Sequence, residues 1–114
     1  MIKIPLTTTP NQALNMTLNR QNATIAVYQR AGFCYLDLGV DTDMIVRGQL
    51  IVPCAAILPP STRFSGQFVM VDTQSPPAEQ QDPDYTGFAG RFEMFYCTPE
   101  EWAELQPRLT ALGA

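Results

Sequence analysis

Apolar and polar residues alternate along much of the first half of the chain, and this period of two limits the fold more than any other feature. Three successive segments show it, around 14–18, 25–27 and 36–40. Side chains of a β-strand point alternately to opposite faces, so the pattern predicts three half-buried strands. The links between them are short and are either polar or contain glycine, which suits antiparallel neighbours. We therefore expect an antiparallel meander.

Three more strands are predicted further along, at 44–52, 68–71 and 91–97. Gly48 lies in the middle of the first of them and indicates a bulge or bend in a curved sheet. With abundant turns and no internal helix, a chain of 114 residues is expected to form one small all-β barrel or sandwich of five to six strands.

The C-terminus changes to a helical pattern. Thr98 is placed to cap a helix, Pro99 suits the first helical position, and Glu101 completes a capping box. We expect a β domain at 1–98 and an amphipathic helical extension at 99–114, which Pro107 should kink or restart about midway. Its apolar side chains are candidates for contact with a partner protein, namely Trp102, Leu105 and Leu109.

A long loop precedes the last strand, from residue 73 to residue 89, and contains three prolines. Loops of this length are either functional or partly mobile until a partner orders them. The stretch that follows Asp82 combines a rigid turn with an aromatic strand. Pro83 fixes its own φ, and Gly87 and Gly90 are able to take φ values that other residues avoid.

The same stretch resembles a calcium-binding loop in its spacing. The residues at positions one, three, five, six and twelve of that pattern are Asp82, Asp84, Thr86, Gly87 and Glu93. Threonine at position five and the strand that follows both argue against calcium, because this type of loop is flanked by helices. A solvated acidic turn is the favoured interpretation.

The composition excludes many activities. There is no histidine, which removes Ser-His-Asp and Cys-His pairs and the commonest zinc ligand. Lys3 is the only lysine, so no phosphate-binding P-loop exists. The three cysteines lie far apart in apolar stretches and are expected to be buried thiols: Cys34, Cys54 and Cys97. No catalytic residue and no cofactor is predicted.

Charge and hydropathy narrow the set of partners. The net charge is −4 and the basic residues are scattered singly, so nucleic acid is not an expected partner. No apolar run has the length of a membrane span, and the first residues lack the plan of a signal peptide, which predicts synthesis in a cytosol. Only 16% of the residues are charged, which suits a protein that neighbours cover.

Several short pieces occur in a definite order between residues 4 and 96. They are Ile4-Pro5-Leu6, Pro10-Asn11-Gln12, Tyr35-Leu36-Asp37-Leu38, Val46-Arg47-Gly48, Val71-Asp72, Asp84-Tyr85 with Gly87, Gly90-Arg91-Phe92 and Phe95-Tyr96. In this order the chain resembles the bacteriophage baseplate plug family, which has an OB-type domain and occurs in contractile-tailed phages. The resemblance implies a small OB-like antiparallel barrel.

The resemblance also implies a structural role in the virion. Such a protein would be made in the cytoplasm of the bacterial host, sit centrally in the tail baseplate against tube and hub proteins, and help to close the tail until contraction. Tail symmetry suggests a ring of three or six copies. The alternative is an OB-fold module that binds single-stranded nucleic acid or an oligosaccharide.

The family has no catalytic residues to transfer, and its matching positions are interpreted as fold-defining. Pro10-Asn11-Gln12 should set the turn before the first strand, Arg47-Gly48 the bend, and Asp84 to Arg91 the closing turn and strand. We expect either Arg91 or Arg47 to pair with either Asp72 or Asp84.

Overall fold

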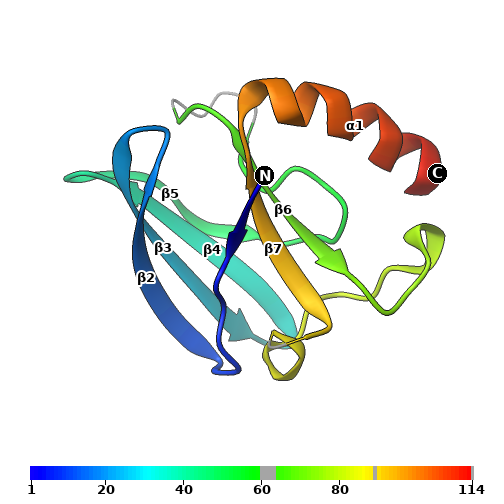
Figure 1. The fold of residues 1–114 in the computed structure, drawn as a ribbon. Coiled ribbons are helices and arrows are strands. Elements are labelled where there is room, and N and C mark those ends of the chain that lie inside the picture. Colours follow the sequence, from blue (N-terminus) through cyan, green and yellow to red (C-terminus); the bar gives the residue numbers. More distant parts are fainter. Residues whose placement is uncertain (60–63, 89, 114) are drawn as a thin grey trace.

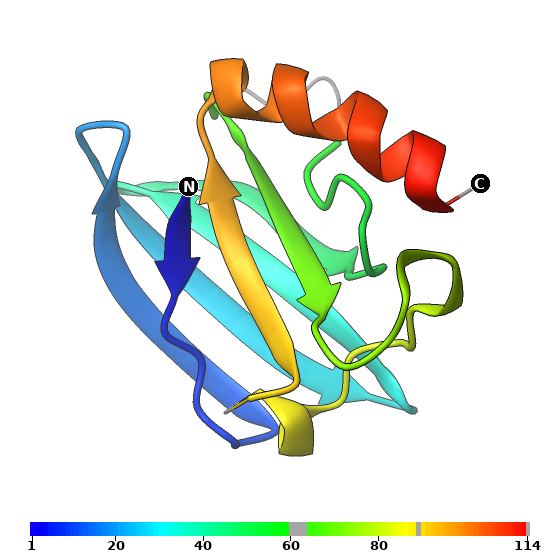
Figure 2. The same ribbon diagram turned by 45° about the vertical axis from the view of Figure 1, so that its right-hand side comes forward.

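The computed structural model describes residues 1–59, 64–88 and 90–113 (Figures 1 and 2). Within these residues the chain forms seven strands, two short 3-10 turns and one α-helix. In chain order they are β1 (Ile2–Ile4), β2 (Asn11–Leu18), β3 (Gln21–Arg30), β4 (Phe33–Val40), β5 (Asp43–Leu50), β6 (Gln67–Asp72), η1 (Pro77–Glu79), η2 (Tyr85–Gly87), β7 (Phe92–Cys97) and α1 (Pro99–Gly113).

Four strands form the larger sheet, in the order β2-β3-β4-β5, and every neighbouring pair is antiparallel. This is the meander that the alternating pattern predicts. Its inner face carries the apolar residues of that pattern, including Ile25 opposite Leu38, and Val27 opposite Leu36, all fully buried. The predicted link between sequence period and buried face is confirmed for β3 and β4.

The smaller sheet has the order β1-β7-β6 and joins the two ends of the β-rich chain. Ile2 lies opposite Tyr96 and Ile4 lies opposite Met94. The prediction of five to six strands is wrong because β1 was missed. Three residues are too few to show a period, and β1 pairs with a strand that is distant in the sequence.

The two sheets face each other, and the described residues do not form a closed barrel. On one side, an isolated parallel bridge links Pro53 to Met70, and the Cys54 N–H donates to the Met70 carbonyl at 2.8 Å. On the other side, β1 and β2 belong to different sheets, and in Figures 1 and 2 they diverge from the turn that joins them. The mostly β, antiparallel part of the prediction is confirmed.

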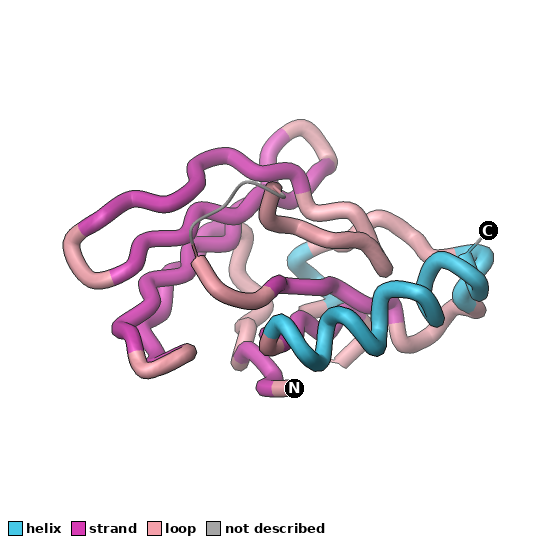
Figure 3. Tube along the Cα trace, turned by 90° about the horizontal axis from the view of Figure 1, so that it is seen from above, coloured by secondary structure: helices cyan, strands magenta, loops and turns pink. Residues whose placement is uncertain are grey.

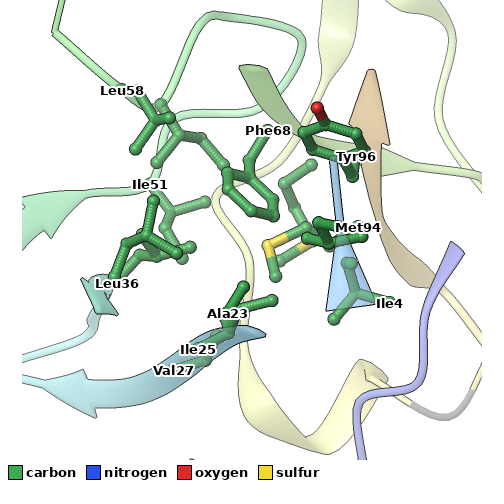
Figure 4. Packing of buried hydrophobic residues seen from close by; sticks show 14 of the residues in the cluster. Ile4, Ala23, Ile25, Val27, Leu36, Ile51, Leu58, Phe68, Met94 and Tyr96 are labelled. Atoms are coloured by element: carbon green, nitrogen blue, oxygen red, sulfur yellow. The ribbon is translucent and has the colours of Figure 1, made fainter. Parts of the chain in front are cut away.

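The hydrophobic core fills the space between the sheets (Figure 4). Phe68 on β6 is fully buried, and its ring centroid lies 6.0 Å from that of Phe64 and 5.6 Å from that of Tyr96. The Tyr96 hydroxyl donates to the Ser65 carbonyl at 2.7 Å, so this buried polar group is satisfied. Aromatic side chains of the smaller sheet thus pack against the aliphatic inner face of the larger one.

The bend predicted at Gly48 is present as an irregularity in the pairing of β4 with β5. Gly48 has a φ of +63°, which glycine adopts without strain. The Asp37 carboxylate accepts the Gly48 N–H at 2.6 Å and the Tyr28 hydroxyl at 2.9 Å. The Asp37 carboxylate on β4 therefore holds the bulge of β5 through the Gly48 N–H, and the Tyr28 hydroxyl on β3 holds this carboxylate in place. Arg47 beside it is exposed.

Helix α1 begins with the predicted capping box. The Thr98 Oγ1 accepts the Glu101 N–H at 3.2 Å, and the Glu101 carboxylate accepts the Thr98 N–H at 2.9 Å. The helix continues through Pro107 to Gly113, so it does not restart there, and a kink at Pro107 stays a prediction. Figures 1 and 3 show α1 on the side of the smaller sheet, where it contacts β7 and η1.

Thr98→Ala should lower the free energy of unfolding by about 1 kcal/mol, because one N–H of the first helical turn loses its acceptor. Thr98→Ser keeps the hydroxyl and is the matched control, expected to remain close to the unsubstituted protein. Urea denaturation followed by circular dichroism measures both. Equal losses in the two variants would show that the hydroxyl does not cap the helix.

Candidate functional site

Six of the predicted fold-defining residues lie in or beside the loop between β6 and β7, residues 73–88 and 90–91, which we call the closing loop: Asp72, Asp84, Tyr85, Gly87, Gly90 and Arg91. In Figure 2 it runs from the end of β6 past η1 and η2 to the start of β7. The Thr73 N–H donates to the Arg91 carbonyl at 2.8 Å, and the Thr73 hydroxyl donates to the same carbonyl at 2.7 Å. These two hydrogen bonds hold the two ends of the loop together within the protein itself.

An ion pair between Arg91 and Asp72 strengthens this base. Arg91 Nε donates to Asp72 Oδ1 at 2.9 Å, and Nη2 donates to Oδ2 at 3.0 Å. The Asp72 side chain is 0% exposed, whereas that of Arg91 is 35% exposed. Two parallel bonds between a guanidinium and a carboxylate are the strongest geometry for such a pair. Of the four pairings considered from the sequence, this one is confirmed.

Backbone groups complete the environment of Asp72. Its carboxylate also accepts the N–H of Gln74 at 3.1 Å and that of Gln81 at 3.2 Å. The hydrogen bond from Arg91 is the main cause that holds the pKa of Asp72 well below its usual range, and it outweighs the opposing effect of burial. Asp72 is therefore an anion at neutral pH that organises the loop, and it is unsuited to proton transfer there.

Gln80 was missed by the sequence analysis, although it holds the middle of the closing loop. Its Oε1 accepts the Asp72 N–H at 2.7 Å, and its Nε2 donates to the Asp72 carbonyl at 2.9 Å and to the Ser75 carbonyl at 3.0 Å. The carboxamide thus pairs with β6 much as another strand would. One glutamine in a polar loop gives no sequence signal for this role.

Gln29, at the end of β3, was also missed, and it connects the closing loop to the larger sheet. Its Nε2 donates to Asp84 Oδ1 at 3.0 Å, and its Oε1 accepts the Tyr85 N–H at 3.0 Å. Beside it, the buried Cys34 thiol donates to the Pro83 carbonyl at 3.3 Å. Asp84 and Tyr85, which the sequence analysis selected, therefore contact the sheet through a residue that it did not select.

Asp84 has a second task at the start of η2. Its carboxylate accepts the Thr86 N–H at 3.1 Å and the Thr86 hydroxyl. The hydrogen bonds from Thr86 and Gln29 lower the pKa of Asp84. This carboxylate acts as a turn cap that is bonded to the sheet.

Gly87 does not use the backbone freedom that glycine offers. Its φ is not positive, so the expected backbone role is wrong at this position. Gly87 is small for another reason, since a Cβ there would lie 2.6 Å from the ring of Phe92. At Gly90, a Cβ would meet no atom within 4 Å among the described residues beyond its chain neighbours. The lack of space for a Cβ, and not a special backbone conformation, explains why residue 87 is a glycine.

The Gln12 side chain bonds to the turn before β2. The Gln12 carboxamide accepts the Thr7 N–H at 2.8 Å and donates to the Thr7 carbonyl at 2.7 Å. The Pro10 carbonyl accepts the Gln29 N–H at 2.9 Å. Gln29 therefore contacts this turn through its backbone and the closing loop through its side chain, while Asn11 begins β2.

The candidate calcium ligands do not form a cluster. Glu93 lies on β7, where its carboxylate accepts from the Lys3 ammonium at 3.0 Å, while Asp84 and Thr86 are bonded to each other at η2. Within the described residues, no group of three or more candidate ligands is placed to hold a metal ion.

The cysteines are mostly as predicted. Cys34 and Cys97 are buried, but Cys54 is only half-buried, and its thiol donates to Gln80 Oε1 at 3.4 Å. Burial raises the pKa of Cys34 to about 11, with smaller contributions from Asp84 and Asp82. The thiol is thus kept neutral, and a neutral thiol is a poor nucleophile.

The residues proposed for partner contact on α1 are only partly accounted for. Trp102 and Leu105 are half-buried, on the helix that contacts η1 and β7. The side chain of Leu109 lies outside the described residues, and contact of this helix with a partner stays a prediction. Within the described part of the chain, no helix has the length and apolar character required to cross a membrane.

The polar side chains of this site bond the closing loop to both sheets, so the arrangement keeps the loop rigid. The carboxylates of Asp72 and Asp84 and the carboxamides of Gln29 and Gln80 are bonded to backbone groups or to other side chains. A family model described as the cyanophage baseplate Pam3 plug gp18 matches residues 1–100, which include both sheets and the closing loop. No curated protein matches the chain.

Proposed function

The chain belongs to the family of cyanophage baseplate plug proteins, and from that premise we propose that it packs against tube and hub proteins at the centre of a phage tail baseplate. It is a structural component of the baseplate in the virion, and it interacts with other baseplate proteins. The observation that carries this conclusion is the family match over residues 1–100. The named partners, and closure of the tail until contraction, are the proposed part.

The surface of the protein supports packing against neighbours. Phe33 is 43% exposed, Leu50 is 40% exposed and Val52 is 44% exposed. Leu50 lies opposite Tyr35 in the register of β4 and β5, and the Tyr35 ring stacks on that of Tyr28 with ring centroids 5.9 Å apart. Large apolar side chains on the outside of a sheet are typical of a surface that another protein covers.

Several finer features belong to the same proposal. The bridge between Pro53 and Met70 supports an open OB-like barrel, because it links the β5 side of one sheet to β6 of the other. The family match ends near the start of α1, which supports a domain at 1–98 and an extension at 99–114. A ring of three or six copies would follow the rotational symmetry of a tail.

We propose that the protein carries out no reaction and binds no nucleic acid. The absence of histidine and the neutral, buried thiol support the first point. The net charge of −4 supports the second, since binding to a phosphate backbone needs a basic groove. Synthesis would take place in the cytoplasm of the bacterial host.

Cryo-electron microscopy of intact tails tests the proposal. We expect density that fits the two sheets on the central axis of the baseplate, in contact with tube and hub, and loss of that density in tails made without the gene. Density elsewhere in the particle would overturn the placement. Fluorescence polarisation with single-stranded DNA at low salt is the second measurement, and tight, salt-sensitive binding would favour the nucleic-acid alternative.

A further inference from the structure

The two sheets have four edge strands, and three of these have a feature that hinders pairing with another strand. β5 contains Asp43, Arg47 and the bulge at Gly48. β1 is only three residues long and carries Lys3. β6 is covered by the segment 53–57, whose N–H groups donate to β6 carbonyls at 2.8 and 3.2 Å. Charges, bulges, short length and cover are the usual protections of a sheet edge.

β2 lacks all of these protections. It is eight residues long, and its sequence Asn-Gln-Ala-Leu-Asn-Met-Thr-Leu contains no charged residue and no proline. A long, uncharged strand at the edge of a sheet is a ready template for another strand. Because the other edges of the same protein are protected, the exception at β2 indicates an edge that is covered in the assembled state.

The register of β2 with β3 identifies the free backbone groups. The Gln29 N–H donates to the Pro10 carbonyl, and hydrogen-bonded pairs then recur at every second residue of an antiparallel ladder. The residues in between turn their N–H and C=O groups away from β3. These residues are exposed, and their N–H groups form no hydrogen bond to another described residue: Asn11, Ala13, Asn15 and Thr17.

Two apolar side chains of β2 that point toward the core are incompletely covered. Leu14 and Met16 are only half-buried, although both pack against the core. β1, the nearest strand of the smaller sheet, forms no ladder with β2 and diverges from it toward the β2–β3 hairpin (Figures 1 and 2). An added strand would complete the burial of these two side chains.

We propose that the free edge of β2 pairs with an extended segment of a neighbouring baseplate protein, which adds a fifth strand to the larger sheet. Backbone groups that point outward at every second residue are complementary to an extended chain and to no other element. The uncharged β2 and the half-buried Leu14 and Met16 favour a segment with alternating apolar residues. The inference rests on the proposed function, because the partner is taken to be a baseplate protein.

A second copy of the chain is the less favoured occupant. Two β2 edges that pair with each other would be related by a two-fold axis. A tail has a direction along its length, so no two-fold axis crosses it, and symmetric pairing of this kind is incompatible with copies arranged around the tail axis. Each copy also carries a net charge of −4, which opposes self-association.

Two variants at one position test the proposal. Asn15→Pro removes an N–H that points away from β3 and places a ring at the free edge, while Asn15→Ala keeps the N–H. Both lose the bond in which Asn15 accepts the Thr24 hydroxyl at 2.7 Å, so they differ only at the edge. Proline with its missing N–H directed to solvent is tolerated in edge strands, so the isolated variants should melt at similar temperatures.

Each variant is then supplied as the sole copy to a phage whose own gene is deleted. We expect tails with Asn15→Ala to contain the protein at the normal level, and tails with Asn15→Pro to contain at most about a tenth of it. Equal incorporation of the two folded variants would overturn the proposal. Absence of the unsubstituted protein from normal tails would instead contradict the proposed function.

Hydrogen exchange of the unsubstituted protein keeps the test independent of how proline affects folding. The amides of Ala13, Asn15 and Thr17 should exchange freely in the isolated protein and about tenfold or more slowly in purified tails. Equal rates in both would overturn the proposal. So would a dimer of the isolated protein by light scattering that protects the same amides, because the occupant would then be a second copy.

Discussion

Arg91→Ala should lower the free energy of unfolding by about 3 kcal/mol, because it leaves the buried Asp72 carboxylate without its counter-charge. The Asp72 side chain is fully buried, whereas the N–H groups of Gln74 and Gln81 remain as partners and limit the loss. Arg47→Ala is the matched control, since Arg47 is exposed and should change stability by less than about 0.5 kcal/mol. Urea denaturation at neutral pH measures both. Similar values for the two variants would show that the ion pair contributes little.

The same substitution should change the dependence of stability on pH. The pKa of Asp72 is lower in the folded protein than in the unfolded chain, so its contribution is complete above the unfolded value of about 4 and is lost as the pH falls toward the folded value. The unsubstituted protein should therefore lose stability below about pH 4 more steeply than Arg91→Ala. The difference between them should be largest at neutral pH. Thermal unfolding at a series of pH values checks this, and parallel curves would contradict it.

Phe68→Ala should have the largest effect on stability, a loss of about 3–5 kcal/mol. Phe68 lies between the sheets, where its ring packs against Phe64 and Tyr96, and a smaller side chain would leave a cavity there (Figure 4). Since a domain of this size is stable by about 5–15 kcal/mol, the variant should melt at a much lower temperature.

Phe33→Ala provides the control for this substitution. Phe33 is 43% exposed on β4, so its loss should cost less than about 1 kcal/mol. Differential scanning calorimetry of the two variants distinguishes the buried ring from the exposed one. A melting temperature for Phe68→Ala close to that of Phe33→Ala would mean that the space between the sheets closes up around the smaller side chain.

Features with a local pattern could be predicted from the sequence. The alternation around 14–18, 25–27 and 36–40 gave three strands of the meander, and the spacing of Thr98 and Glu101 gave the helix cap. In both cases the residues that interact are neighbours in the chain or share a simple period. The resemblance to the baseplate plug family, drawn from short ordered pieces, agrees with the family match over residues 1–100.

Features that depend on distant contacts were predicted incompletely. From the sequence, Arg91 with Asp72 was only one of four possible pairings, because opposite charges alone do not determine a partner. Gln29 and Gln80 were missed, since a carboxamide that bonds to backbone groups needs no particular neighbour in the sequence. β1 was missed for the same reason, because the strand that stabilises it lies at the far end of the β domain.

The smaller sheet pairs strands from opposite ends of the chain, and this has a consequence for synthesis on the ribosome. β1 is the first strand to be made, but its partner strand β7 ends at Cys97, so the sheet β1-β7-β6 is complete only after the chain has emerged as far as that residue. The hairpins of the larger sheet are complete by residue 50. Between the synthesis of residue 50 and the completion of β7, the smaller sheet does not yet cover the apolar inner face of the larger one. The nascent chain is most prone to aggregation in this interval.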